Sequence, residues 1–260
     1  MNIIHIGAGN IGKGFIYPTL FDYNKNINFT FLDIDRDIIN HLKNTNEYEV
    51  LYVESEQDEI RKYDNYKAFE LDEIFYQDNL YLLKKVDLIT TSIGKKNLKN
   101  LINWFKKASI YIEKKVVIMC CENGYKVSSY FENIIKNKNQ NITFVDCLVD
   151  RIIPTQSFKD SNIIRSEKSF EWVCNEYQWP KEIQRLLNIK YVNNIDGHIY
   201  KKMCMLNGLH SSIAWQRYNI DKFMDIKIVD QHYKEWTLLI LLKIILKKYH
   251  KLYLKNIILK

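Results

Sequence analysis

IIHIGAGNIGKGF, residues 3–15, runs from a short apolar segment directly into a glycine-rich loop. Its glycines Gly7, Gly9 and Gly12 have the GxGxxG spacing. The segment before them is typical of a β-strand, the residues after them begin a helical pattern, and Asp33 ends the next apolar run 21 residues after the third glycine. A strand, a glycine turn, a helix and a distant acidic residue form the context in which this spacing binds a dinucleotide. We therefore predict a dinucleotide-binding loop here.

The residues of this loop have distinct expected roles. Gly7 permits the tight turn, Gly9 lets the backbone approach a pyrophosphate, and Gly12 lets the helix pack closely on the strand. Asn10 and Ile11 lie at the start of the helix, whose free N–H groups and dipole favour phosphate. All five are predicted to be cofactor-binding residues.

The acidic residue after the second strand predicts which dinucleotide is bound. Asp33 is expected to accept hydrogen bonds from the adenosine ribose hydroxyls and to repel a 2′-phosphate, which favours NAD. Arg36 lies three residues further on and leaves NADP open as the alternative.

Polar residues also end two later strands. TTSIG at residues 90–94 contains Thr91 and Gly94, and CEN at residues 121–123 ends in Asn123. Ligands of such sheets bind beside the carboxyl ends of the strands. We expect Thr91 and Gly94 to bind the cofactor and Asn123 to lie at its nicotinamide end, although polar residues also end strands without any ligand.

Short apolar runs alternate with helical patterns through the first 154 residues, which indicates parallel βαβ units. Beyond that point residues 166–174 could add one strand or two, and from residue 194 the pattern is almost wholly helical. We predict an α/β protein with a Rossmann domain, a doubly wound and mostly parallel sheet, at residues 1–154, followed by a mainly α-helical substrate and catalytic domain at residues 155–260. Strands are expected at residues 2–6, 27–32, 48–53, 86–92, 115–119 and 142–145, helices at 11–21, 36–42, 97–112 and 125–136, and a loop at 54–67.

The charge, the cysteines and the apolar runs of the sequence limit the classes of protein that it can belong to. The net charge of +7 is concentrated in residues 243–260, which hold six lysines and no carboxylate. Without an aromatic-interleaved basic motif, this favours a solvated helix face over a nucleic-acid site. The five cysteines lack the paired spacing of a zinc site, and no apolar run is long enough to span a bilayer. We expect a cytoplasmic protein with free thiols that binds neither nucleic acid nor membrane.

A second group of polar residues lies far along the chain, in KMCMLNGLH at residues 202–210. At 100° per residue of an α-helix, Asn207 lies roughly 140° and His210 roughly 80° around the axis from Lys202. Such a trio could supply a proton-transfer group, an oxyanion donor and an orienting imidazole beside a hydride carrier. The alternative is a solvated helix face.

Five motifs in this order resemble the polyol-specific long-chain dehydrogenases, in particular the members that act on mannitol 1-phosphate. The resemblance covers residues 1 to about 217. The motifs are GAGNIGKGF at 7–15, TTSIG at 90–94, CEN at 121–123, FVDCLVDRIIP at 144–154 and K-x4-N-x2-H at 202–210.

The resemblance implies a role for each matching residue. Lys202 matches the general acid/base of the family, Asn207 and Asn123 match the asparagines that polarise the carbonyl, and His210 matches the histidine that fixes a substrate hydroxyl. No metal takes part. The residues it places in the substrate cleft are Asp150, Arg151 and Asn194; a structural ion pair is the alternative for the first two.

The implied reaction is NAD-dependent hydride transfer between mannitol 1-phosphate and fructose 6-phosphate, in a monomer or weak homo-oligomer. A mannitol 2-dehydrogenase or a fructuronate or tagaturonate reductase is the alternative within the family. Family members continue further beyond the lysine helix, whereas residues 227–260 are a simple alternation dominated by Ile, Leu, Lys and Tyr. We therefore expect a shortened C-terminus, and an NAD-binding remnant with impaired catalysis is the second alternative.

Overall fold

In the computed structural model the chain is described over residues 1–53, 57–136, 139–153, 163–208 and 211–212. Its backbone packs into two compact units, Met1–Ile195 and Asp196–Lys260. The first unit extends past the expected boundary at residue 154, because strands from both sides of that point pair with each other. The division into a cofactor domain and a substrate domain stays a prediction.

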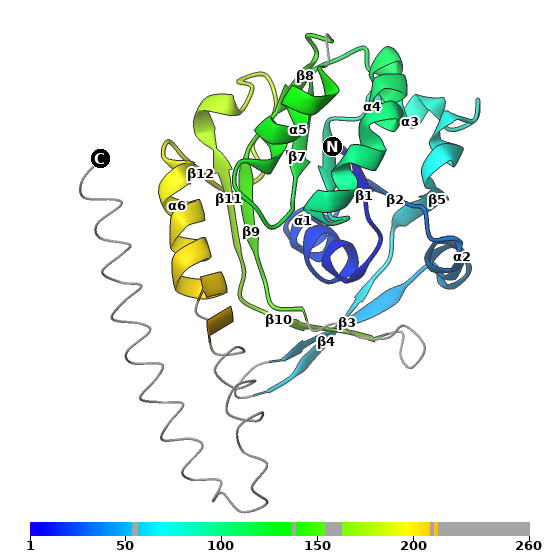
Figure 1. Ribbon diagram of the computed structural model, residues 1–260. Coiled ribbons are helices and arrows are strands. Elements are labelled where there is room, and N and C mark those ends of the chain that lie inside the picture. The colour runs from blue at the N-terminus through cyan, green and yellow to red at the C-terminus, as the bar shows by residue number, and fades with distance from the viewer. Residues whose placement is uncertain (54–56, 137–138, 154–162, 209–210, 213–260) are drawn as a thin grey trace, which may run out of the picture. The chain divides into compact units, whose positions relative to one another are not determined.

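Six parallel strands form the main sheet, in the order β5-β2-β1-β6-β7-β8 (Figure 1). Numbered along the chain, these strands have the order 3-2-1-4-5-6, which confirms the predicted doubly wound Rossmann sheet. The order reverses between β1 and β6, and ligands of such sheets bind beside the carboxyl ends of the strands at this reversal. The strands are β1 (Asn2–Ile6), β2 (Asn28–Asp33), β5 (Tyr66–Glu70), β6 (Leu88–Thr91), β7 (Val116–Cys120) and β8 (Ile142–Phe144).

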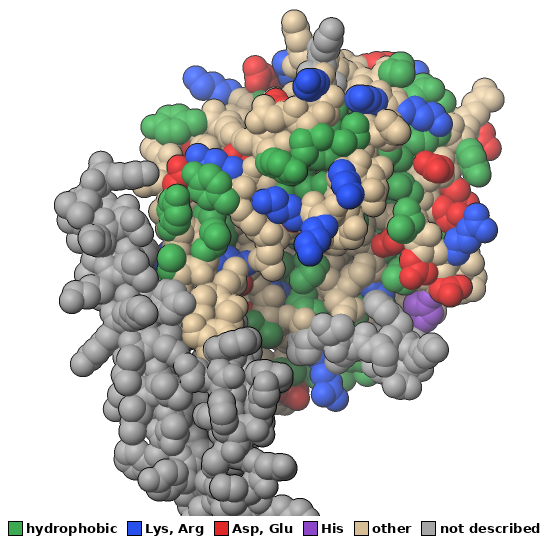
Figure 2. Space-filling view, in the orientation of Figure 1, with side chains coloured by type: hydrophobic (Ala, Val, Ile, Leu, Met, Phe, Trp, Pro, Cys, Tyr) green, Lys and Arg blue, Asp and Glu red, His purple; other side chains and the backbone are tan. Residues whose placement is uncertain are grey.

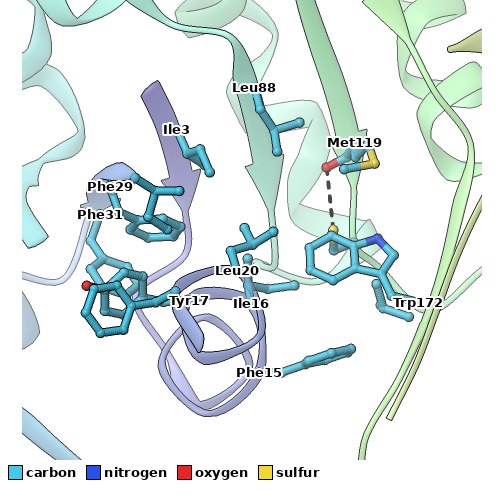
Figure 3. Packing of buried hydrophobic residues seen from close by; sticks show 14 of the residues in the cluster. Ile3, Phe15, Ile16, Tyr17, Leu20, Phe29, Phe31, Leu88, Met119 and Trp172 are labelled. Atoms are coloured by element: carbon cyan, nitrogen blue, oxygen red, sulfur yellow. Dashed lines mark hydrogen bonds between the residues drawn. The ribbon is translucent and has the colours of Figure 1, made fainter. Parts of the chain in front are cut away.

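Both faces of this sheet are buried, because alternate residues of its strands belong to two separate apolar clusters. Ile3 of β1 and Phe29 of β2 belong to one cluster, whereas Ile4 of β1 belongs to the other. Figure 3 shows the first cluster, in which the side chains of the first helix face the strands. Helices α3 (Leu80–Lys85), α4 (Ile102–Ala108) and α5 (Val127–Ile135) contribute to the second cluster on the opposite face. Burial on two faces explains why these strands read as continuous apolar runs.

The helices follow the strands as the βαβ pattern predicts. The first helix begins with a π-helical turn, η1 (Gly12–Ile16), and continues as α1 (Tyr17–Tyr23). Asp35 caps α2 by accepting hydrogen bonds from the N–H groups of Asp37 and Ile38. The others in the first unit are α2 (Arg36–Thr45), η2 (Leu71–Phe75), α3 (Leu80–Lys85), η3 (Lys95–Leu101), α4 (Ile102–Ala108), η4 (Ser109–Tyr111), α5 (Val127–Ile135) and η5 (Glu176–Gln178).

Two three-stranded sheets complete the first unit. One has the order β10-β3-β4 and the other β12-β11-β9. Strand β10 pairs with β3 although more than a hundred residues separate them in the sequence. The strands are β3 (Tyr48–Val53), β4 (Glu59–Tyr63), β9 (Cys147–Asp150), β10 (Ile163–Glu167), β11 (Glu171–Asn175) and β12 (Lys190–Val192).

The prediction of a loop at residues 54–67 is wrong. The chain instead forms β4 and, from Tyr66, the edge strand β5 of the main sheet. Only Tyr63 of β4 and Ala68 of β5 are buried, and the other residues of both strands are half-buried or exposed. Around α2, Lys and Arg side chains lie interspersed with acidic ones on the surface (Figure 2), and Arg36 and Lys43 pair there with Glu70 and Glu73.

The described part of the second unit is helical. Helix α6 (Ile195–Lys201) continues into a second π-helical turn, η6 (Lys202–Asn207). Across the described parts of the chain, no helix is both long enough and apolar enough to cross a membrane. The expected cytoplasmic location stays a prediction.

Candidate functional site

The glycine-rich loop connects the carboxyl end of β1 to the first helix. Gly7 has a φ of +113°, and a Cβ there would lie 2.6 Å from the carbonyl oxygen of Ser92. A Cβ on Gly12 would lie 2.3 Å from the carbonyl oxygen of Gly7. A Cβ on Gly9 would meet no atom within 4 Å. The chain's own packing thus requires Gly7 and Gly12, whereas the open space at Gly9 fits the close approach of a ligand to the backbone.

The carboxylate of Asp33 lies directly beside this loop. Its Oδ2 accepts a hydrogen bond from the N–H of Ala8 at 2.6 Å, and its Oδ1 accepts one from the N–H of Asp35 at 3.0 Å. These bonds fix the carboxylate at the end of β2, where a Rossmann sheet holds a ribose. Arg36, the residue that left NADP open, donates from Nε to Glu70 at 3.0 Å.

A buried lysine directly follows the loop. The side chain of Lys13, in the first helical turn, is 3% exposed. Burial lowers the pKa of Lys13 to about 8, although the negative charges of Asp33 and Asp35 oppose that shift. A lysine with this pKa is mainly protonated at pH 7, so a positive charge lies near the two carboxylates at the end of β2.

Glu122 joins the two strand ends at which cofactor contacts were expected. Its Oε1 accepts from the hydroxyl of Thr91 and from the N–H of Ile93, both at 2.9 Å, and its Oε2 accepts from the N–H of Gly94 at 2.8 Å. Glu122 as a whole residue is 7% exposed. Glu122 therefore fixes the shape of the loop after β6, in which Gly94 has a φ of +87°. Glu122 is the central residue of the CEN motif, and its position in the sequence did not indicate this role.

His5 of β1 supports the glycine loop from inside the sheet. Its Nδ1 lies 2.7 Å from the hydroxyl of Thr90, and its Nε2 lies 2.9 Å from the hydroxyl of Ser92. Ser92 donates its own proton to the carbonyl of Gly7 at 3.3 Å. Ser92 must then accept from the Nε2–H of His5, and Nδ1 accepts from Thr90. Burial lowers the pKa of His5 to about 3, so the ring is neutral at physiological pH.

The neutral state of His5 predicts an acid-sensitive fold. The unfolded chain takes up a proton on His5 near pH 6.5, whereas the folded chain does so only near pH 3. Between these values the unfolded state binds more protons, so the free energy of unfolding falls by up to about 1.4 kcal/mol per pH unit as the pH drops. Urea unfolding from pH 7 to pH 4 measures this slope, which we expect to be shallower in His5→Gln. Equal slopes in the two proteins would contradict the assignment.

The other predicted site residues of the first unit lie at the ends of elements. Asn123 is exposed and directly follows Glu122, Asp150 is half-buried at the end of β9, and Asn194 is exposed just before α6. Arg151 donates hydrogen bonds to the backbone carbonyls of Gly14 and Lys168. Its guanidinium is therefore engaged by the chain itself.

Lys202 and Asn207 lie in the second unit and share the π-helical turn η6. Lys202 is half-buried, and Asn207 is exposed. Because such a turn bonds residues five apart, it brings Lys202 and Asn207 closer to one side of the helix than the 140° of regular α-helical spacing predicts. His210 lies outside the described residues.

No arrangement of three or more His, Cys, Asp or Glu side chains within the described residues could hold a metal ion. All five cysteines are free thiols, and four of them are buried. Independence of zinc stays a prediction.

A doubly wound parallel sheet with this loop at its switch point defines a dinucleotide-binding protein of the Rossmann class. Residues 1–186 match the sequence profile of the mannitol dehydrogenase Rossmann domain. The chain belongs to the mannitol dehydrogenase family.

Curated relatives agree with this assignment, and a solved structure shares the fold. A mannitol-1-phosphate 5-dehydrogenase of Mycoplasma mycoides subsp. mycoides SC is 35% identical, over 86% of this chain and 68% of its own length. One from Mycoplasma pneumoniae is 30% identical over 82% of this chain, which spans 56% of that relative. The fold is also that of Pseudomonas fluorescens mannitol 2-dehydrogenase, solved with NAD and D-mannitol, with a TM-score of 0.66 and 11% identity over 96% of this chain and 68% of that one.

Proposed function

We propose that this protein is an NAD-dependent dehydrogenase that interconverts D-mannitol 1-phosphate and D-fructose 6-phosphate. The main observation in support of this cofactor is the glycine loop at the switch point between β1 and β6. The loop has open space at Gly9, and the carboxylate of Asp33 lies beside it. The preference for NAD is supported by that carboxylate and by the pairing of Arg36 with Glu70. The substrate is supported by the names of the curated relatives.

Within this proposal, the glycine loop and Asp33 would hold NADH, which would supply a hydride to the carbonyl carbon of the sugar phosphate. Lys202 donates the proton that the reacting oxygen needs, which converts the carbonyl to an alcohol, and it takes the proton back in the opposite direction. Asn207 and Asn123 donate hydrogen bonds to that oxygen and stabilise the negative charge that develops on it. His210 orients a substrate hydroxyl, and Asp150 and Asn194 contribute to substrate binding.

The proposal is tested by adding fructose 6-phosphate, fructose or fructuronate to the protein with NADH and following NADH oxidation. We expect turnover with fructose 6-phosphate to exceed that with both unphosphorylated compounds, and NADH to be preferred over NADPH. A preference for fructose or fructuronate would assign the protein to another activity of the same family.

NADH binding is measured on the same preparation. Tight binding without oxidation by any of the three compounds would refute the catalytic part of the proposal and retain only nucleotide binding. This second measurement matters because the chain spans 68% and 56% of the two relatives described above.

A further inference from the structure

The helix that follows the phosphate-binding loop begins with a turn that is wider than an α-helical one. In η1 the N–H of Tyr17 donates to the carbonyl of Gly12, five residues earlier. Turns of this kind occur often at functional sites. Two side chains from other elements donate hydrogen bonds to carbonyls within it: Tyr48 to Lys13 at 2.8 Å and Arg151 to Gly14 at 3.1 Å. The hydroxyl of Ser166 also lies 3.3 Å from the carbonyl of Gly14 and 3.0 Å from that of its neighbour Glu167.

Gly14 allows this arrangement because it has no side chain. A Cβ there would lie 2.9 Å from Cγ2 of Ile164 and 3.0 Å from Cδ1 of Ile153. Strand β10 and the segment just after Arg151 therefore pack directly on the helix. Two of the sequence motifs, GAGNIGKGF and FVDCLVDRIIP, meet at this contact.

Arg151 is held at this contact by aromatic rings as well as by hydrogen bonds. Its guanidinium carbon lies 5.1 Å from the ring centre of Phe15, 4.9 Å from that of Phe170 and 5.4 Å from that of Tyr52. Its Nη2 donates to the carbonyl of Lys168 at 2.8 Å. A planar guanidinium that lies close to three rings and donates to two backbone carbonyls has a fixed orientation. That orientation directs its Nη1 at the first helix.

We propose that Arg151 is a positioning residue for the dinucleotide, which acts through the carbonyl of Gly14 on the turn behind the phosphate-binding loop, and that it does not bind the sugar phosphate. The proposal rests on the proposed NAD binding. Arg151 fixes the position of the first helix. The N–H groups of the loop that precedes this helix are then placed where they can donate hydrogen bonds to the pyrophosphate. Loss of this contact weakens cofactor binding and leaves the substrate's contacts intact.

The test is the affinity of Arg151→Gln for NADH and for ADP-ribose, which retains the pyrophosphate and lacks the nicotinamide. We expect the dissociation constants of both ligands to rise about tenfold, because a charged hydrogen bond to the turn is lost. The KM for fructose 6-phosphate at saturating NADH is expected to stay within about twofold of the wild-type value, as it does when only cofactor binding is lost. Arg165→Gln is the matched control, since it removes the same charge from an exposed position on β10.

Ser166→Ala provides a second test that changes no charge. It removes the hydroxyl that lies 3.3 Å from the carbonyl of Gly14, and we expect a rise of at most about threefold in both dissociation constants, as for a neutral hydrogen bond. If Arg151→Gln does not fold, Arg151→Lys replaces it, since a lysine keeps the positive charge and loses the planar guanidinium that bonds the two carbonyls.

Wild-type dissociation constants in both variants would overturn the proposal. A raised KM for fructose 6-phosphate with unchanged NADH affinity would also overturn it and would assign Arg151 to the substrate. Wild-type protein that binds neither NADH nor ADP-ribose would refute the proposed cofactor and this proposal together. Binding without turnover would refute only the proposed catalysis, because the dissociation constants still decide the role of Arg151.

Discussion

Replacing Gly12 by alanine is expected to lower the free energy of unfolding by about 3 kcal/mol and to weaken NADH binding about a hundredfold. The added Cβ would lie 2.3 Å from the carbonyl oxygen of Gly7 and 2.7 Å from Nε2 of His5. The first of these is a backbone atom and the second belongs to a ring held by two hydroxyls, so neither can move without distorting the loop. Urea unfolding and fluorescence titration with NADH measure the two effects.

Gly9→Ala is the matched control for this prediction, because its Cβ would meet no atom of the chain within 4 Å. We expect wild-type stability, together with NADH binding weakened about tenfold by the methyl group that now faces the ligand. Equal stability losses in the two variants would show that the loop is not packed as described. Unchanged NADH affinity in Gly9→Ala would show that the pyrophosphate does not bind at this loop.

Lys202→Ala is expected to reduce kcat for fructose 6-phosphate about a thousandfold, since general acid/base catalysis contributes that order of magnitude. NADH affinity should stay at the wild-type value, because Lys202 is proposed to exchange a proton with the sugar phosphate and not to bind the dinucleotide. Steady-state kinetics and an NADH titration on the same preparation check both parts.

Lys201→Ala controls for the loss of a positive charge next to Lys202. Lys201 is the exposed last residue of α6, and its variant is expected to retain wild-type kcat. If Lys202→Ala keeps turnover within about threefold of wild type, the proton-transfer role assigned to Lys202 is wrong.

The sequence predicts the main sheet well where strands are buried on both faces. The apolar runs that form β1, β6 and β7 are typical of strands buried on both faces of a parallel sheet. Strands β4 and β5 escaped prediction because β4 buries only Tyr63 and β5 only Ala68, so local composition resembles a loop. Their partners β3 and β2 stabilise them, and pairing between distant segments leaves no local signal.

Within the site, the residues of the glycine loop could be predicted from the sequence, whereas the side chains that support the loop could not. Gly7, Gly9, Gly12 and Asp33 have a fixed spacing whose physical reasons are local, and the structure places them together. The hydrogen bonds of Glu122 to the loop after β6, and those of His5 to Thr90 and Ser92, join residues 28 to 87 positions apart. Such bonds depend on which strands lie side by side, and the residue types alone do not reveal them. The contact of Arg151 with Gly14 was missed for the same reason.

The pairing of β3 with β10 has a consequence for the order in which the chain acquires its structure during synthesis. Residues 48–53 leave the ribosome more than a hundred residues before their partner strand, which corresponds to roughly ten seconds of translation. During that interval β3 has β4 on one edge and an unpaired row of peptide groups on the other, the kind of edge that recruits other chains. The first helix likewise lacks its contacts with Arg151 and Ser166 until those residues have been synthesised. A polypeptide cut at residue 154 would keep that edge open permanently, so expression of the nucleotide-binding part should extend through β12.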